Sequence, residues 1–184
     1  MVTVAEQDNK MKELAQRCKN GDQHAYTEVY HLYARKVYNT IYRFIGHTGE
    51  AEDIMQDCFV DAFTKIDSFI GKGSLESWIK SIAINKSLSH LRSRKLTFAE
   101  LDINIHHIAE FDDDQMDYMK YSCEQIHKAI LQLSDGYRTI VNLYVFENIP
   151  HEEIAQLLGI SHSTVRSQYH RAKKRIEMYL NGFD

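Results

Sequence analysis

Proline and glycine are scarce in this chain, and their scarcity constrains the fold more than any other feature of the sequence. Pro150 is the only proline among 184 residues, and the eight glycines are scattered. Folds built of many short strands need turn residues at short intervals, and collagen-like chains need far more of both residues. The hydrophobic content of 43% is sufficient for a core. The sequence therefore predicts an all-α protein with one medium domain or two small ones.

Neither a membrane segment nor a cysteine framework is predicted. No apolar run approaches the roughly 18 residues of a spanning helix, and the opening MVTVAEQDNK becomes charged before a signal-like stretch forms. We therefore expect a cytoplasmic protein without membrane insertion. Cys18, Cys58 and Cys123 are odd in number and lack CxxC spacing, so no disulfide or zinc site is predicted. We expect them to be small core residues.

The formal net charge of −4 conceals a division along the chain. Residues 97–121 hold seven acids and one lysine, a balance of −6, which leaves +2 for the rest. Residues 86–95 and 161–176 contain several cations and no acid. Because local clusters set the potential that a phosphate meets, two basic surfaces indicate nucleic-acid binding despite the acidic total.

Helical spacing and capping residues predict a first domain over residues 1–95. Asp22 is a plausible N-cap after a short helix over residues 10–20, and the helix that it starts runs to Ile45. A third helix has an apolar face and directs Asp53, Gln56, Asp57 and Asp61 outward. After a glycine-containing loop, Ser74 caps a helix that runs towards Lys95.

A second helical domain is predicted over residues 121–184, after a flexible acidic linker over residues 96–120. The linker has poor periodicity and a run of three aspartates. One helix is expected over 121–133 and another over 137–146, with Ile140, Val141 and Tyr144 directed inward. Pro150 then begins a further helix.

The sequence HEEIAQLLGISHSTVRSQYHRAKKRI, which starts at His151, is typical of a helix-turn-helix. Ala155 is small where helices cross, Gly159 permits a sharp turn, and Ser161 can cap the second helix. One face of that helix is apolar, and the other is polar and cationic. Such a face can enter the major groove, where arginine pairs with guanine. The outward residues are Ser163, Arg166, Ser167, His170 and Lys174.

The helix that follows the glycine-containing loop carries a second, weaker signal. Trp78, Ile82, Asn85, Ser89 and Arg92 fall on one stripe downstream of Phe69. An aromatic and amide surface that ends in cations suits a strand with exposed bases. By their spacing alone, Trp78 and Ile82 are more typical of core residues.

Taken together, these segments resemble an extracytoplasmic-function sigma factor, a two-domain member of the sigma-70 superfamily of RNA polymerase specificity subunits. The resemblance covers residues 10 to 181. It depends on AEDIMQDCFVDAFTKI, on FIGKGSLESWIKSIAINKSLSHLRSRK, and on the helix-turn-helix with RSQYHRAKKRI. It implies a sigma2-like helical bundle and a sigma4-like helix-turn-helix domain, which bind core polymerase and promoter DNA and are held by an anti-sigma factor.

The resemblance also implies roles for particular residues. The polymerase clamp coiled coil would contact Asp53, Gln56 and Asp57, and the polymerase flap would lie near residues 137–146. The minus-ten element would be opened and bound by Phe69, Ser74, Trp78, Asn85, Lys86 and Arg92. The minus-thirty-five element would meet Ser163, Arg166, Ser167, His170, Arg171 and Lys174. Family members often have an extra arginine where Gln168 stands, so the promoter sequence is left open.

Other readings explain less of the chain. A metalloprotease HExxH motif would need a second histidine where Ala155 stands, and no other pattern predicts an enzyme or a cofactor. Asp102, His106, His107 and Glu110 could share a helical face, but histidines in an acidic linker are usually solvated, so no metal site is predicted. A helix-turn-helix repressor or activator without polymerase would leave the first domain without a role. An interaction adaptor would leave both cationic faces unexplained.

Overall fold

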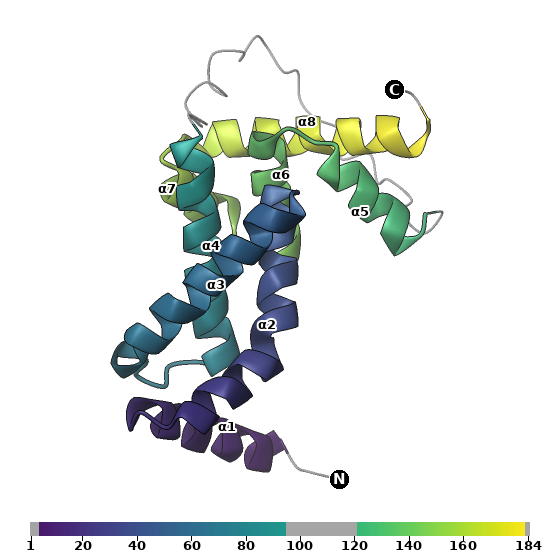
Figure 1. Cartoon of the computed structure of the whole chain (residues 1–184). Helices are drawn as coiled ribbons and strands as arrows, with labels where there is room; N and C mark the ends of the chain where they lie inside the picture. The colour runs from purple at the N-terminus through teal and green to yellow at the C-terminus, as the bar shows by residue number, and fades with distance from the viewer. Residues whose placement is uncertain (1–3, 95–120, 183–184) are drawn as a thin grey trace. The chain divides into compact units, whose positions relative to one another are not determined.

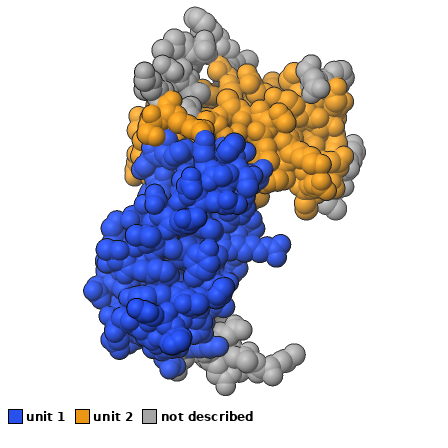
Figure 2. Space-filling view, viewed as in Figure 1, with its two compact units in different colours: residues 1–90 blue, residues 91–184 orange. Residues whose placement is uncertain are grey.

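A computed structural model describes residues 4–94 and 121–182, with side chains from residue 10 onward (Figure 1). All regular elements in these two ranges are helical, which confirms the predicted all-α fold. The chain divides into two compact units, Met1–His90 and Leu91–Asp184 (Figure 2). The unit boundary falls within the last turns of a helix, close to the expected domain end at residue 95. The predicted linker over 96–120 lies outside the described residues.

Unit 1 is built of α1 (Val4–Lys19), α2 (Gln23–Ile45), α3 (Thr48–Thr64), the short 3-10 turn η1 (Ile66–Ser68) and α4 (Leu75–Ser93). The predicted boundaries have local physical causes. The Asp22 carboxylate accepts from the backbone N–H groups of His24 and Ala25 and so begins α2. Gly46 ends that helix at a φ of 72°, and the His47 side chain accepts from Glu50 N at the start of α3.

The core of unit 1 lies where α2 packs on α1 and α3, and α4 joins these helices through contacts with α2 and α3. Phe44, Ile41 and Leu88 are fully buried in it. The Cys58 Sγ–H donates to the carbonyl of Ile79 at 3.7 Å, which joins α3 to α4. Cys18 and Cys58 are buried as predicted, whereas Cys123 is exposed. The expectation for Cys123 was wrong because it occupies the open first turn of a short helix.

Unit 2 is built of α5 (Cys123–Leu131), α6 (Asp135–Val141), the π-helical segment η4 (Asn142–Phe146), α7 (His151–Leu158) and α8 (His162–Leu180). Helix α8 packs on α5, α6 and α7. The Arg138 guanidinium is buried, donates to the carbonyls of Leu131 and Leu133, and pairs with the Asp135 carboxylate. This arginine therefore ties the turn between α5 and α6 together.

Segment η4 differs from the continuous α-helix predicted over residues 137–146. The Glu147 N–H donates to the carbonyl of Asn142, five residues earlier, at 3.1 Å. Ile140 and Val141 are buried as expected, but the Tyr144 side chain is 39% exposed rather than inward. The wider π turn changes the phase of the helix, which turns Tyr144, Val145 and Phe146 outward. No described helix is long and apolar enough to cross a bilayer.

Candidate nucleic-acid and polymerase interfaces

Helices α7 and α8 form the helix-turn-helix that the sequence predicts. Gly159 adopts a φ of 71°, and the carbonyl of Ala155 accepts from the N–H groups of Gly159 and Ile160 at 2.9 and 3.1 Å. The Ser161 hydroxyl then accepts from Thr164 N at 3.0 Å and begins α8. Ile154 and Val165 are fully buried. The turn is therefore fixed by backbone hydrogen bonds, a cap and apolar packing together.

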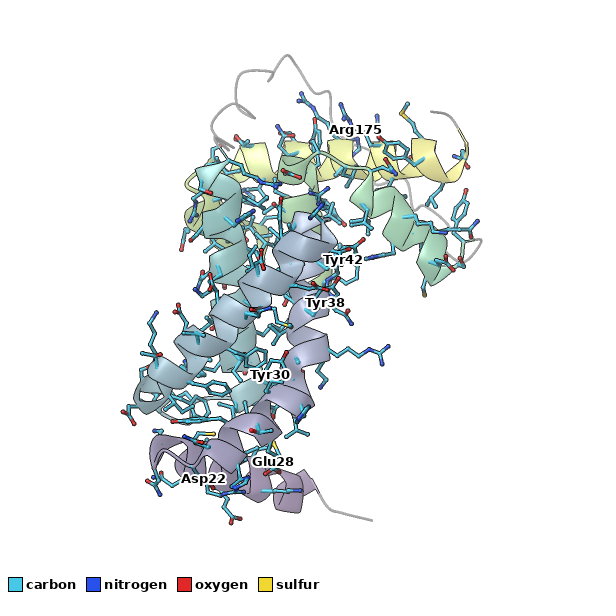
Figure 3. All side chains as sticks on the ribbon, viewed as in Figure 1. Asp22, Glu28, Tyr30, Tyr38, Tyr42 and Arg175 are labelled. Carbon is cyan, nitrogen blue, oxygen red and sulfur yellow. The ribbon has the colours of Figure 1, made fainter. Side chains whose placement is uncertain are left out.

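The outer side of α8 carries the predicted cations. Ser163, Arg166 and Lys174 are exposed, whereas His170 and Arg171 are half-buried. Further along the helix, Arg175 is also exposed, and its guanidinium carbon lies 4.8 Å from the centre of the Tyr137 ring (Figure 3). A surface of this kind offers guanidinium and ammonium donors to phosphates and base edges.

Ser167 does not belong to the exposed face. Its side chain is only 8% exposed, and its hydroxyl donates to the carbonyl of Thr164 at 3.0 Å. The neighbouring Gln168 is also buried. The buried arc of α8 thus includes Thr164, Ser167 and Gln168 beside Val165 and Ala172. This arc is wider than the apolar stripe in the sequence. The prediction that Ser167 faces outward was therefore wrong.

Near the start of α7, an aromatic cluster surrounds His151. The His151 ring centre lies 4.3 Å from that of Tyr144 and 5.3 Å from that of Tyr169. Burial lowers the pKa of His151 below its usual 6.5, and the nearby His162 and Arg166 lower it further against the opposing effect of Glu152. The charged form of His151 is therefore disfavoured beside the cationic face of α8.

On unit 1, α3 presents the acidic face that the sequence predicts. Asp53, Gln56 and Asp57 are all exposed, while Ile54 and Cys58 on the opposite side are buried. Sequence reasoning missed Val60, which is 63% exposed one turn beyond Gln56. The sequence feature that could have revealed Val60 is its spacing: it is apolar, it follows Gln56 by four residues, and it lies outside the buried stripe of the helix. The α3 face therefore combines negative charge with an apolar contact.

A shallow groove of about 390 Å³ runs beside this face, between α2 and α3. Its walls are Ala34, Arg35, Tyr38, Glu52, Met55 and Gln56. The Tyr38 ring is stacked on that of Tyr42, with ring centres 5.9 Å apart, and both side chains come from α2 (Figure 3). The α2 residues of this groove extend the α3 face to a second helix, and none of them was predicted from the sequence.

The loop between η1 and α4 begins at a buried aromatic anchor. Phe69 is 7% exposed, and its ring centre lies 5.5 Å from that of the half-buried Trp78. The Lys19 ammonium donates to the carbonyl of Phe69 at 2.7 Å. Ser74 caps α4, because its hydroxyl accepts from Ser77 N at 3.0 Å. Phe69 is thus a core residue that supports the loop, which corrects the expectation that its ring meets DNA.

The remaining predicted residues of α4 differ in their surroundings. Asn85 and Arg92 are exposed. The Lys86 ammonium lies 3.2 Å from the Asp61 carboxylate, which also accepts from Lys65 at 3.1 Å. The hydrogen bonds from Lys65 and Lys86 lower the pKa of Asp61. Lys86 is therefore partly neutralised within the protein.

A second pocket, of about 230 Å³, lies between α2 and α4. Its lining includes Lys36, Arg43 and Lys80 against the single acid Glu76, whose carboxylate pairs with Lys36 at 2.7 Å. No sequence pattern marked these residues, because they come from two helices some 40 positions apart. The pocket adds positive charge to the surface at the start of α4.

Comparison with known proteins assigns both units. The family described as Sigma-70 region 2 matches residues 29–97, and Sigma-70, region 4 matches residues 123–176. The ECF RNA polymerase sigma factor SigW of Bacillus subtilis is 30% identical over 181 residues, which cover 92% of this chain and 96% of that protein. The RNA polymerase sigma-H factor of Pseudomonas aeruginosa is 29% identical over 185 residues, 95% of this chain and 94% of that protein.

Two solved structures share the fold. CnrH, in complex with the cytosolic domain of CnrY, matches with a TM-score of 0.54 and 20% identity, over 95% of this chain and 99% of that one. The sigma factor RpoE of Bartonella quintana, in complex with the anti-sigma factor NepR, matches with a TM-score of 0.53 and 23% identity, over 85% and 96%. Matches to both sigma-factor regions favour the predicted sigma factor over a helix-turn-helix repressor or activator that acts without polymerase. The chain belongs to the extracytoplasmic-function group of the sigma-70 family, the RNA polymerase sigma factors that direct promoter-specific transcription initiation.

Proposed function

We propose that this sigma factor binds core polymerase and the two promoter elements through three separate surfaces. The α3 face binds the clamp coiled coil of core polymerase, the loop before α4 and α4 itself bind the opened minus-ten element, and α8 reads the minus-thirty-five element. The observation that carries the proposal is the helix-turn-helix of α7 and α8, whose outer side exposes Ser163, Arg166 and Lys174. The first two surfaces lie within the residues matched by Sigma-70 region 2, and the first half of α8 lies within those matched by Sigma-70, region 4.

For the minus-thirty-five element, the geometry favours the first half of α8. Arg166 is one turn after the Ser161 cap, where recognition helices present side chains to base edges. Lys174 lies two turns further along and suits a phosphate. His170 and Arg171, both half-buried, complete the surface. We leave Ser167 out of the contact set because its hydroxyl is held by the Thr164 carbonyl.

For core polymerase, the support is the combination of charge and apolar area on α3. Asp53, Gln56 and Asp57 are exposed along one side, and Val60 continues the same stripe. An interface core needs a desolvated apolar contact, while charges at its rim select the partner and speed association. The exposed side chains Tyr144, Val145 and Phe146 of η4 offer a similar contact to the polymerase flap.

For the minus-ten element, the support is the set of polar groups on α4. Ser74, Asn85 and Arg92 are exposed, Trp78 is half-buried, and Lys86 is positioned by Asp61. An amide can hydrogen-bond the edge of an unstacked base, and an indole can stack on its face. Phe69 acts indirectly, since its buried ring supports Trp78.

The partners follow from the same assignment. CnrH and RpoE were each solved in complex with a second protein, and for RpoE that protein is an anti-sigma factor. We infer that an anti-sigma factor also holds this chain and competes with core polymerase. The chain has no covalent chemistry and no cofactor of its own, because the polymerase performs the reaction. It acts in the cytoplasm, where polymerase and promoters are found.

Run-off transcription with purified core polymerase tests the proposal directly. The full chain is expected to start transcripts at promoters that core polymerase alone ignores. Replacement of Asp57 by lysine should weaken core binding about tenfold through charge reversal at the docking face. The matched control is Glu13→Lys, which reverses an exposed acid on α1. The assignment would be contradicted if the wild type started no transcripts. It would also be contradicted if Asp57→Lys and Glu13→Lys bound core polymerase with equal affinity.

A further inference from the structure

The loop that joins η1 to α4 holds one apolar side chain in an exposed position between two fixed ends. At its start, the buried Phe69 ring rests on Trp78, and the Phe69 carbonyl accepts from Lys19. At its end, Ser74 caps α4. Between these ends, Gly71 and Gly73 adopt φ values of 74° and 80°, which favour glycine. Ile70 is therefore presented by a short loop with an anchor on each side.

The Ile70 side chain is 73% exposed, a larger fraction than for any other large hydrophobic side chain among the described residues. Most of this apolar side chain therefore faces solvent in unit 1. Its neighbours in the loop, Gly71, Lys72, Gly73 and Ser74, are all exposed as well. The side chain is free to enter another molecule without any change in the core.

The surroundings of Ile70 fit a nucleic acid better than a protein. Protein interfaces gather several apolar residues around a central contact. Here a single apolar side chain is followed by the exposed cation Lys72, and the loop leads to the polar groups of α4. Proteins that distort DNA use this combination, an isoleucine, leucine or phenylalanine that enters a base step beside cations that meet the phosphates.

We propose that Ile70 is a positioning residue that enters a base step of the minus-ten element and holds that step apart while the adjacent base leaves the stack. This inference rests on the proposed function of the loop and α4, and it assigns the wedge to a residue outside the set that binds the base. The exposed side chain replaces part of the stacking that the extruded base loses, and Asn85 and Trp78 receive the base once it has left.

The experiment uses holoenzyme assembled from the full chain and core polymerase. Promoter duplexes carry 2-aminopurine at successive positions of the minus-ten element, so that fluorescence increases when a base unstacks. Ile70→Ser is expected to slow this increase about tenfold, whereas Ile70→Leu should remain within about twofold of the wild type. On a promoter with a pre-formed bubble, Ile70→Ser should be as active as the wild type. The matched control is Met178→Ser, which removes an exposed apolar side chain at the far end of α8.

The other outcomes separate the wedge from the proposed function. If Ile70→Ser opens duplexes at the wild-type rate while Asn85→Ala loses the minus-ten element, the wedge is wrong and the function of α4 stands. If both variants behave like the wild type, the role of α4 fails as well. A defect of Ile70→Ser that persists on the bubble promoter places its action after opening and overturns the wedge. Weakened core binding by Ile70→Ser would overturn it too, because the side chain would then contact protein.

Discussion

The Lys86 ammonium lies 3.2 Å from the Asp61 carboxylate, so a cation expected at the minus-ten element is already paired within unit 1. Both side chains are partly solvated, at 26% and 33% exposure, so the ion pair is weak and screened by salt. Asp61 therefore weakens the positive potential that Lys86 offers to a phosphate while it keeps the ammonium on one side of α4.

Replacement of Asp61 by asparagine should release Lys86 and strengthen binding of holoenzyme to fluorescent single-stranded promoter DNA by about twofold at low salt. Anisotropy titration measures the change. Asp67→Asn removes an exposed carboxylate on η1 that has no ion pair with Lys86 in the described structure, and it should change affinity less. An equal gain for both variants would show that net charge, not the pair, controls the attraction.

Loss of Arg166 and Arg171 together should weaken promoter binding by holoenzyme and leave core binding intact. Each phosphate contact contributes about 0.9 to the slope of log affinity against log salt, so the slope should become shallower by about one to two. Titration of a labelled promoter at several salt concentrations gives this slope. The double variant Lys10→Ala with Lys12→Ala removes the same charge from the exposed side of α1 and should keep the wild-type slope. If both double variants changed the salt slope equally, contact of α8 with bases and phosphates would be contradicted.

His151 makes unit 2 sensitive to acid. Its folded pKa lies below the usual 6.5, because burial and the neighbouring cationic groups disfavour the charged ring. As pH falls, the unfolded chain takes up the proton first. The stability contribution is therefore complete above about 6.5 and is lost as pH falls from there towards the lower folded value.

His151→Phe keeps a ring beside Tyr144 and removes the titration, so it should reduce the loss of unit 2 stability between pH 7.5 and 5.5. Amide hydrogen exchange of the α8 backbone measures the stability of unit 2. Trp78, the only tryptophan of the chain, reports unit 1 in the same sample and serves as the internal control. An unchanged pH dependence of α8 protection in the variant would rule out His151 as the source.

Gly159 is the backbone feature on which the helix-turn-helix depends. Its φ of 71° is costly for any side chain, although a Cβ there would meet nothing within 4 Å. Gly159→Ala should therefore lower the unfolding free energy of unit 2 by about 1 kcal/mol from backbone strain alone. Urea unfolding followed by circular dichroism measures it. Gly49→Ala is the control, since that glycine lies within α3 and a Cβ would make only ordinary contact with the His47 ring. It should be neutral or slightly stabilising, and an equal loss in both variants would refute the strain argument.

Signals that act within a few residues were read correctly from the sequence. Asp22, Ser74 and Ser161 cap helices as expected, because a side-chain oxygen needs only the next two or three backbone N–H groups. The helix that follows Pro150 was found for the same reason, since proline fixes the entry to α7.

Positions decided by tertiary packing were harder to predict. Ser167 and Phe69 are polar and aromatic residues whose burial is decided only when the helices pack, Ser167 on the packed side of α8 and Phe69 against the Trp78 ring. Tyr144 was misplaced because one π turn shifts the phase of every later side chain in the helix. Periodicity gives the direction of a side chain only while the helix geometry stays regular, and this condition fails at Tyr144. Ser167 lies in a regular α-helix and Phe69 in a loop, so their burial depends on the elements that pack around them.

The π turn of η4 has a consequence for how this surface can diverge. A π bulge corresponds to one additional residue in an otherwise regular helix. Removal of a single codon there would rotate the three outward side chains by about 100°, while the buried Ile140 and Val141, which precede the turn, would keep their places. A lineage can thus redraw the contact presented by this part of the second unit in one mutational step, and inside the unit this step requires repacking of the buried Asn142 and Leu143 of η4.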